Sequence, residues 1–326
     1  TGAHPDSHGV YIPRSLSAHL KGYSEFLQVN LFHEFFGHGL FCEHAIPGQR
    51  IVSLEQSLAE TEKKMLGLEE LPPKKHYKVN ETNPFFEKYR MQREELQGFF
   101  RQNIHNYEGF AIWLEHFLAE ATEHRQLFEH KIDELVSPEY KELFEAFHAF
   151  SEDKGNFALI AQLGFPKYYD DNLIIDTLKR IYKDDFQSIE LAMIYGSEKP
   201  YSDIDLFIVS DKIKQSRNHW IDIYAITPEE FEKESAMFSI AVTDPLFSGR
   251  PIVGDPSYPE QLKNRLLKQP ITQEAIDYNL QRSEEQGDIA IIYPEGSKER
   301  DIALSYQESF KRNGEELRRG NKILTL

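Results

Sequence analysis

Cysteine, long apolar runs and an excess of positive charge are all missing from this sequence. A single cysteine, Cys42, among 326 residues excludes a disulfide framework within the chain. It favours a reducing compartment, most simply the cytoplasm. No apolar run approaches the roughly 20 residues of a membrane-spanning helix. The chain begins with Thr1 and without a charged-then-apolar leader, which favours a processed chain or a fragment of a longer one.

Basic side chains are outnumbered, with 37 Lys and Arg against 54 Asp and Glu, and the net charge is -17. Such a surface repels phosphate backbones, so nucleic acid is disfavoured as a partner, and no membrane partner is expected. Clustered carboxylates suit hard cations instead.

The composition describes a globular protein, and its length favours two domains. Hydrophobic residues make up 40% of the 326 positions, which is enough for each half to bury its own core. All but one of the 13 histidines lie in residues 1–160, so the two halves use different chemistry. We expect domains over 1–160 and 161–326, with the boundary within 150–168.

Amphipathic helices dominate the first half. An irregular segment over residues 1–13 comes first, and Pro47-Gly48 is expected to end the first helix. Residues 50–82 are polar, and Pro72-Pro73-Lys74-Lys75 marks a loop within them. Asn106 is a plausible cap for the third helix. The apolar spacing predicts helices over residues 16–45, 84–103, 106–130 and 138–150.

The second half changes pattern. A helix is expected over 171–183, and helical segments follow the last strand. Short β-type runs cover residues 189–195, 204–209 and 221–226. The fold class expected for the whole chain is therefore α+β: a mainly helical domain, then a small α/β domain with a mixed sheet and a helical C-terminal extension.

The segment His33-Glu34-Phe35-Phe36-Gly37-His38 lies inside the first predicted helix. In a regular helix, residues five apart differ by about 140° and cannot both reach one metal ion. A one-turn π-bulge would absorb the extra residue, and Gly37 is where such a distortion costs least. The segment therefore predicts a metal site only if the helix is bulged there.

This His-Glu-x-x-Gly-His form, followed by Gly39, resembles the zinc-peptidase signature with one residue inserted, as in the dipeptidyl peptidase III family. The later stretch Glu108-Gly109-Phe110-Ala111 resembles the helix that supplies the third zinc ligand in that family and in bacterial zincins. The resemblance implies a zincin-like metallopeptidase, a hydrolase that acts on a peptide or protein substrate.

The resemblance also implies a role for each residue. His33, His38 and Glu108 are the implied zinc ligands, and they leave a fourth position for a water molecule of lowered pKa. Glu34 takes that water's proton and hands it to the leaving amine. Glu115, two helical turns after Glu108, is a candidate to orient a ligand histidine.

Two points leave this interpretation open. Where the family pattern has a carboxylate four residues after the third ligand, this chain has Ile112. The two histidines can also be unrelated polar residues at a helix edge. Four further residues are unranked candidates to stabilise an oxyanion: Tyr11, His105, Tyr107 and His116.

The second constellation lies in the second half, where a predicted strand ends in Gly196-Ser197 and the next begins at Asp203. Alternation along a strand puts Asp203 and Asp205 on one face, where paired carboxylates can bridge two magnesium ions. A third predicted strand carries Asp222.

Residues 168–256 resemble the polymerase-beta-type nucleotidyltransferase superfamily, although the turn after the Gly-Ser pair is shorter than in many members. The resemblance implies transfer of a nucleoside monophosphate from ATP or another triphosphate to a hydroxyl acceptor. It implies three magnesium ligands: Asp203, Asp205 and Asp222.

Asp222 is also the implied general base. Gly196 permits close backbone approach to the nucleotide, and Ser197 holds its phosphates at the N-terminus of a following helix.

The leading hypothesis is a bifunctional enzyme in which both sites work. One alternative is a nucleotidyltransferase alone, modifying an antibiotic, toxin or protein, with the first half a non-catalytic binding module. Another is a non-catalytic interaction protein with two degenerate sites.

Overall fold

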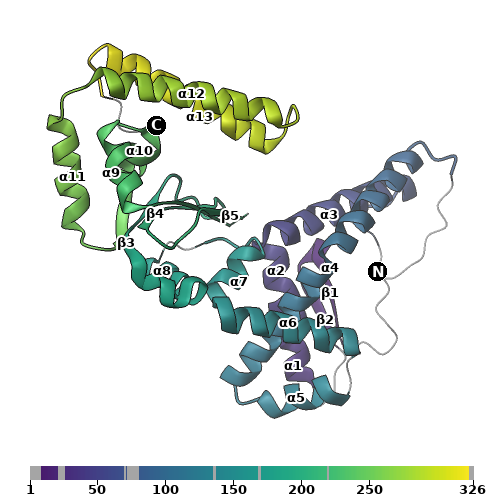
Figure 1. Ribbon diagram of the computed structural model, residues 1–326. Coiled ribbons are helices and arrows are strands. Elements are labelled where there is room, and N and C mark those ends of the chain that lie inside the picture. Colours follow the sequence, from purple (N-terminus) through teal and green to yellow (C-terminus); the bar gives the residue numbers. More distant parts are fainter. Residues whose placement is uncertain are drawn as a thin grey trace. The chain divides into compact units, whose positions relative to one another are not determined.

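The computed structural model describes residues 9–20, 26–69, 71, 81–134, 137–167, 170–218 and 220–322, and these combine helices with a mixed sheet in an α+β fold (Figure 1). Contacts divide the chain into two compact units, Thr1–Pro166 and Lys167–Leu326. This division falls within the expected boundary segment 150–168. In the described parts of both units, every helix is too short or too polar to cross a membrane.

Unit 1 is a helical unit with one small hairpin. Its strands β1 (Gly9–Ile12) and β2 (Ser17–Leu20) pair antiparallel, with the 3-10 turn η1 (Pro13–Ser15) between them. The helical elements are α1 (Leu27–Leu31), the π-helix η2 (Phe32–His38), α2 (Gly39–His44), α3 (Ile46–Leu66), α4 (Phe86–Ala121), α5 (Arg125–Glu134), α6 (Pro138–Lys154) and α7 (Asn156–Gln162).

The first predicted helix is wrong at its start. Residues 17–20 form β2, and the helical run made by α1, η2 and α2 covers only residues 27–44. The expected irregular segment 1–13 is also wrong where β1 forms; residues 1–8 lie outside the described part. Extended backbone at Ala45, with ψ of 137°, ends the run.

Pro47 begins a helix where it was expected to end one. It lies in the first turn of α3, where a missing backbone N–H breaks no helical hydrogen bond. Within the polar stretch 50–82, residues 50–66 are helical, and the loop marked by Pro72-Pro73-Lys74-Lys75 lies outside the described residues. The polar side chains of residues 50–66 lie mainly on the exposed face of α3.

The two helices expected over 84–103 and 106–130 are one continuous helix, α4, and then α5. Asn106 lies inside α4 and caps nothing. The helix over 138–150 is confirmed as α6.

Two glycines let the helices of unit 1 approach closely. A Cβ built on Gly37 of η2 would lie 2.6 Å from Cα and 2.8 Å from Cβ of Ala111 in α4. A Cβ on Gly48 would overlap the carbonyl oxygen of Phe41, so α3 can fold back onto α2 only with glycine there. Buried side chains such as Phe41, Ile51 and Phe110 fill the space between these helices.

Unit 2 is built on a five-stranded mixed sheet with the order β5-β6-β4-β3-β7. Only the β4–β6 pair is parallel among these described strands. The strands are β3 (Ile189–Tyr195), β4 (Ile204–Ser210), β5 (Ser216–Arg217), β6 (Ile221–Ile226) and β7 (Arg250–Val253). The three predicted runs are confirmed as β3, β4 and β6.

Helices precede and follow these strands along the chain. The expected helix over 171–183 is confirmed as α8. The helical elements are α8 (Asp171–Tyr182), η3 (Lys183–Ser188), α9 (Pro228–Ala236), α10 (Ile240–Ser248), α11 (Ser257–Lys268), α12 (Gln273–Ile292) and α13 (Lys298–Arg318). Buried residues of α9 to α13 share one core with β3 and β4, in which Met193, Phe207 and Phe231 are fully enclosed.

We expect Gly37→Ala to lower the free energy of unfolding of unit 1 by about 1–3 kcal/mol, because the added methyl overlaps backbone atoms of α4 that cannot move independently. Urea denaturation measures it. The matched control is Gly98→Ala in α4, where a Cβ meets nothing within 4 Å. It should instead stabilise the helix by about 0.5–1 kcal/mol. Equal stability of Gly37→Ala and wild type would contradict the close crossing.

Candidate metal centre and carboxylate site

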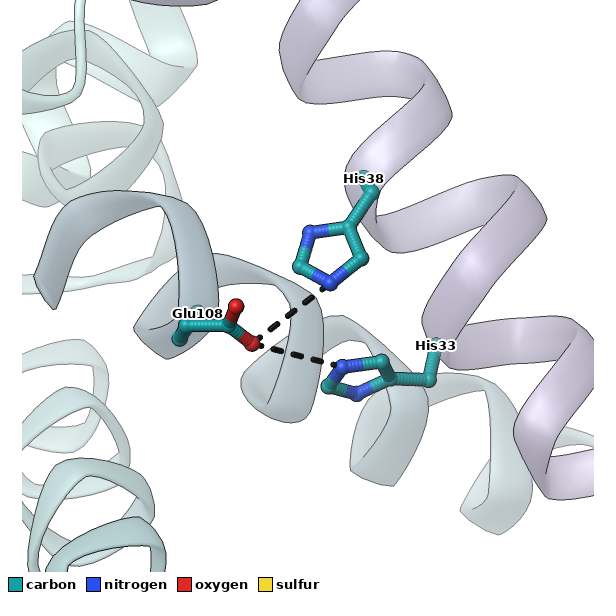
Figure 2. A group of neighbouring side chains, drawn as sticks. All are labelled: His33, His38 and Glu108. Carbon is teal, nitrogen blue, oxygen red and sulfur yellow. Dashed lines mark ion pairs between the residues drawn. The ribbon is translucent and has the colours of Figure 1, made fainter. Parts of the chain in front are cut away.

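Three side chains from two elements of unit 1 converge on one point. His33 and His38 project from η2, and Glu108 projects from α4 to meet them (Figure 2). The Oε2 atom of Glu108 lies 3.6 Å from Nε2 of His33 and 3.5 Å from Nε2 of His38. All three donor atoms lie within 4.8 Å of one another.

These separations fit a metal ion better than direct hydrogen bonds. Bonds of roughly 2.0–2.1 Å in a tetrahedral zinc site place neighbouring donors about 3.3 Å apart. The observed 3.5 and 3.6 Å are close to that spacing and longer than ordinary hydrogen bonds. Among the described residues, this is the one group of three or more such side chains with donors so close. The set could therefore hold a zinc ion.

The π-helix is what makes the convergence possible. Residues 32–38 wind as a π-helix, which confirms the bulge that the five-residue spacing required. Both histidines are consequently buried and lie on the side of η2 that meets α4, with ring centroids 4.7 Å apart.

Glu34 follows the first histidine and lies against the hairpin. A Cβ built on Gly9 of β1 would come 2.6 Å from its Cγ. Burial raises the pKa of Glu34, while the neighbouring His33 opposes that rise. The carboxyl group of Glu34 thus lies in a partly desolvated position where the charges of His33 and Glu108 influence it.

Glu115 lies where the sequence placed it, beside a ligand histidine. Nδ1–H of His33 donates to its Oε2 at 3.0 Å, which directs Nε2 of the ring toward Glu108. Glu115 is fully buried, and Nζ of Lys131 donates to its Oε1 at 2.7 Å. Lys131, from α5, carries no motif, so sequence reasoning missed it.

His38 is held differently. Its ring stacks on Tyr107 at a centroid distance of 4.0 Å, and its buried Nδ1 has no hydrogen-bond partner among the described residues. Tyr11 is also near, with its ring 6.4 Å from that of His38. Of the other oxyanion candidates, His105 is exposed and His116 packs among Phe128, Phe144 and His148 away from the three donors.

A second residue that sequence reasoning missed is Tyr140 of α6. Its hydroxyl donates to Oε2 of Glu108 at 2.8 Å. Burial raises the pKa of this hydroxyl above its usual range, so it stays a donor. No signal in the sequence marks Tyr140, because it reaches Glu108 only through the packing of α6 on α4.

Charge in this cluster is divided unevenly. Burial lowers the pKa of His33, but the carboxylates of Glu108 and Glu115 outweigh it and raise that pKa to about 9. Burial lowers the pKa of His38 to about 3. For Glu108, burial raises the pKa, yet the two histidines and Tyr140 outweigh it and bring it to about 2. Glu108 is therefore an ionised oxygen donor.

In unit 2, two of the predicted aspartates are neighbours on adjacent strands. Asp205 of β4 is the register partner of Asp222 in the parallel strand β6. Tyr195, at the end of β3, is the partner of Asp205 on its other side, so the turn at Gly196 begins beside this carboxylate. Gly196 has φ of 74°, and any Cβ there would overlap Asp205. Only glycine suits that position.

The three carboxylates influence one another without forming a tight cluster. Burial, with Asp203 and Asp222 adding like charge, raises the pKa of Asp205 to about 6. Asp203, Asp205 and Asp222 do not meet the 4.8 Å spacing that the group in unit 1 meets within the described residues. Arg217 of β5 pairs with Asp222, its Nε lying 3.2 Å from Oδ2.

The turn after Gly196 differs from the expectation in one respect. No helix follows Ser197, because described residues 197–203 form turns that lead directly into β4. The hydroxyl of Ser202 closes the segment by donating to the carbonyls of Ser197 at 2.6 Å and Lys199 at 2.8 Å. A helix N-terminus is therefore not available at Ser197 to hold phosphates.

No protein-family model matches the chain, and neither a curated protein nor a solved structure matches it. The two resemblances drawn from short motifs therefore stay predictions, and the geometry of each unit carries the functional argument.

We expect Asp205→Asn to raise the thermal stability of unit 2 at about pH 7.5 and to lose that effect below about pH 4. The folded-state pKa of Asp205 lies above its usual value, so its ionisation disfavours folding as pH rises through about 6. Below the unfolded pKa both states hold the proton. Calorimetry across this range measures it.

The control for this measurement is Asp211→Asn, which removes an exposed carboxylate just after β4. It should shift the melting temperature little at either pH. A stabilisation by Asp205→Asn that is the same at low and neutral pH would argue against repulsion among the three aspartates.

Proposed function

We propose that the chain is a bifunctional enzyme, with a zinc-dependent peptidase site in unit 1 and a magnesium-dependent nucleotidyltransferase site in unit 2. The observation that carries the first activity is the convergence of His33, His38 and Glu108 from η2 and α4. Two imidazoles and one carboxylate are the donor set of catalytic zinc sites that keep a position open.

Zinc held by this set would act as a Lewis acid toward a peptide carbonyl and a water molecule. Glu34 is the residue that moves the proton: it accepts one from the attacking water and delivers it to the departing amine, as the C–O bond forms and the C–N bond breaks. Its pKa, raised by burial, suits a group that must both take and release a proton. Glu115 and Lys131 hold His33 in position.

The second activity is supported by the register of β4 and β6. Asp205 and Asp222 lie side by side, and the carboxylate of Asp205 occupies the space that a side chain at position 196 would fill. Burial, with the like charges of Asp203 and Asp222, raises the pKa of Asp205, and a divalent ion bound there would offset both effects. Asp222 would accept the proton of the attacking hydroxyl, once Arg217 moves from it.

The alternatives predict different behaviour. If unit 1 is only a binding module beside an active transferase, the purified protein holds no stoichiometric zinc and cleaves no peptide. If both sites are degenerate, neither metal uptake nor nucleotide transfer occurs.

Glu34→Gln should leave about one zinc per chain and reduce peptide hydrolysis by about 10²–10⁴-fold, because the metal ligands remain while the proton acceptor is lost. Elemental analysis and a peptide-library cleavage assay measure the two effects. Glu43→Gln, on the exposed face of α2, is the matched control and should cleave as wild type does. Unchanged hydrolysis by Glu34→Gln would refute the role of Glu34.

For unit 2, wild-type protein with magnesium should transfer label from an α-labelled nucleoside triphosphate to an acceptor. The Asp203→Asn/Asp205→Asn double variant should reduce transfer to background, because two of the three implied metal carboxylates are lost. Asp211→Asn is again the control. Transfer that persists in the double variant would remove these residues from the site.

A further inference from the structure

The position of the third donor, Glu108, depends on α6, a helix that carries no recognised sequence motif. Resting on the metal site proposed above, we propose that Tyr140 of α6 is a positioning residue, which selects Oε2 of Glu108 as the oxygen presented to the ion. Gly109 contributes to this positioning, because its lack of a side chain lets α6 pack closely against α4.

The first support is that one oxygen atom takes part in every contact. Oε2 of Glu108 accepts the hydrogen bond of Tyr140 at 2.8 Å, and the same atom faces Nε2 of His33 and of His38. A hydrogen bond to an ionised carboxylate is among the stronger kinds, so it restricts rotation of the carboxyl group. Without it, either oxygen of Glu108 could turn toward the histidines.

The second support is the packing that delivers Tyr140. Any Cβ on Gly109, the residue after Glu108, would overlap the ring of Phe147 in α6. Tyr140 and Phe147 are seven residues apart, so they lie on one face of α6. That face rests on α4, and Nε1–H of Trp113 donates to Oγ of Ser151 at 3.4 Å further along the same contact.

These contacts give a steric reason for the Glu-Gly pair in the third-ligand helix. Glu108 supplies the donor, and Gly109 removes the side chain that would hold α6 away. With α6 displaced, the hydroxyl of Tyr140 could not stay 2.8 Å from Oε2.

The test uses Co²⁺ in place of zinc, because the visible absorption of Co²⁺ reports the number and arrangement of its ligands. Tyr140→Phe keeps the ring and removes the hydroxyl. We expect Co²⁺ to bind to this full-length variant about 10–100-fold more weakly than to the full-length wild type. We also expect the absorption spectrum to change, with circular dichroism unaltered. Tyr89→Phe, near the other end of α4, is the control and should match wild type.

A second pair of variants tests the packing step. Gly109→Ala should reproduce the spectral change of Tyr140→Phe, because its methyl meets the Phe147 ring. Adding Phe147→Ala removes that ring and should restore the wild-type spectrum, a rescue that a general loss of stability would not give.

The outcomes separate this inference from the function on which it rests. If wild type binds Co²⁺ and Tyr140→Phe shows the same affinity and spectrum, the positioning role is overturned and the metal site stands. If wild type takes up no Co²⁺, the metal site itself is refuted, and the positioning role is refuted with it.

Discussion

The close crossing of η2 and α4 at Gly37 and Ala111 is the contact on which unit 1 depends. Ala111 lies about one helical turn after Glu108. The distance between the η2 and α4 backbones at this crossing therefore determines how close the Glu108 carboxylate comes to the two histidines. The crossing and the π-turn act together. The π-turn brings two imidazoles to one side of η2, and the missing side chain at Gly37 lets the third donor approach them.

The two sites treat buried carboxylates in opposite ways. Glu108 lies among histidines and a tyrosine hydroxyl, and its pKa falls to about 2. Asp205 is partly buried near two other carboxylates, and burial, with their like charge, raises its pKa to about 6. Partners within the protein thus stabilise the first charge, whereas burial and like charges destabilise the second. The charge of Glu108 is therefore stabilised by its neighbours in unit 1, whereas ionisation of Asp205 is disfavoured by its surroundings in unit 2.

Several helix boundaries could not be predicted because tertiary packing overrides local signals. Pro47-Gly48 is typical of a helix end, yet Pro47 opens α3 and Gly48 lets that helix pack on α2. Asn106 is typical of a cap, yet it lies inside α4, where the next residues contact His38 of η2 and Phe147 of α6. Three of the five strands of unit 2, β3, β4 and β6, were predictable, because each is a short apolar run with most of its residues buried, whereas β5 is two exposed residues and gives no such signal.

The sequence alone determined the spacing of His33 and His38, and that spacing permits a shared metal only on a π-turn. It also determined that Asp205 and Asp222 lie near the starts of two consecutive apolar runs, and that Glu115 shares a helix face with Glu108. Tertiary structure alone decided that Glu108 meets the histidines, and that Lys131 and Tyr140 join them. Contacts between distant segments depend on how helices pack, and periodicity within a segment does not encode that packing.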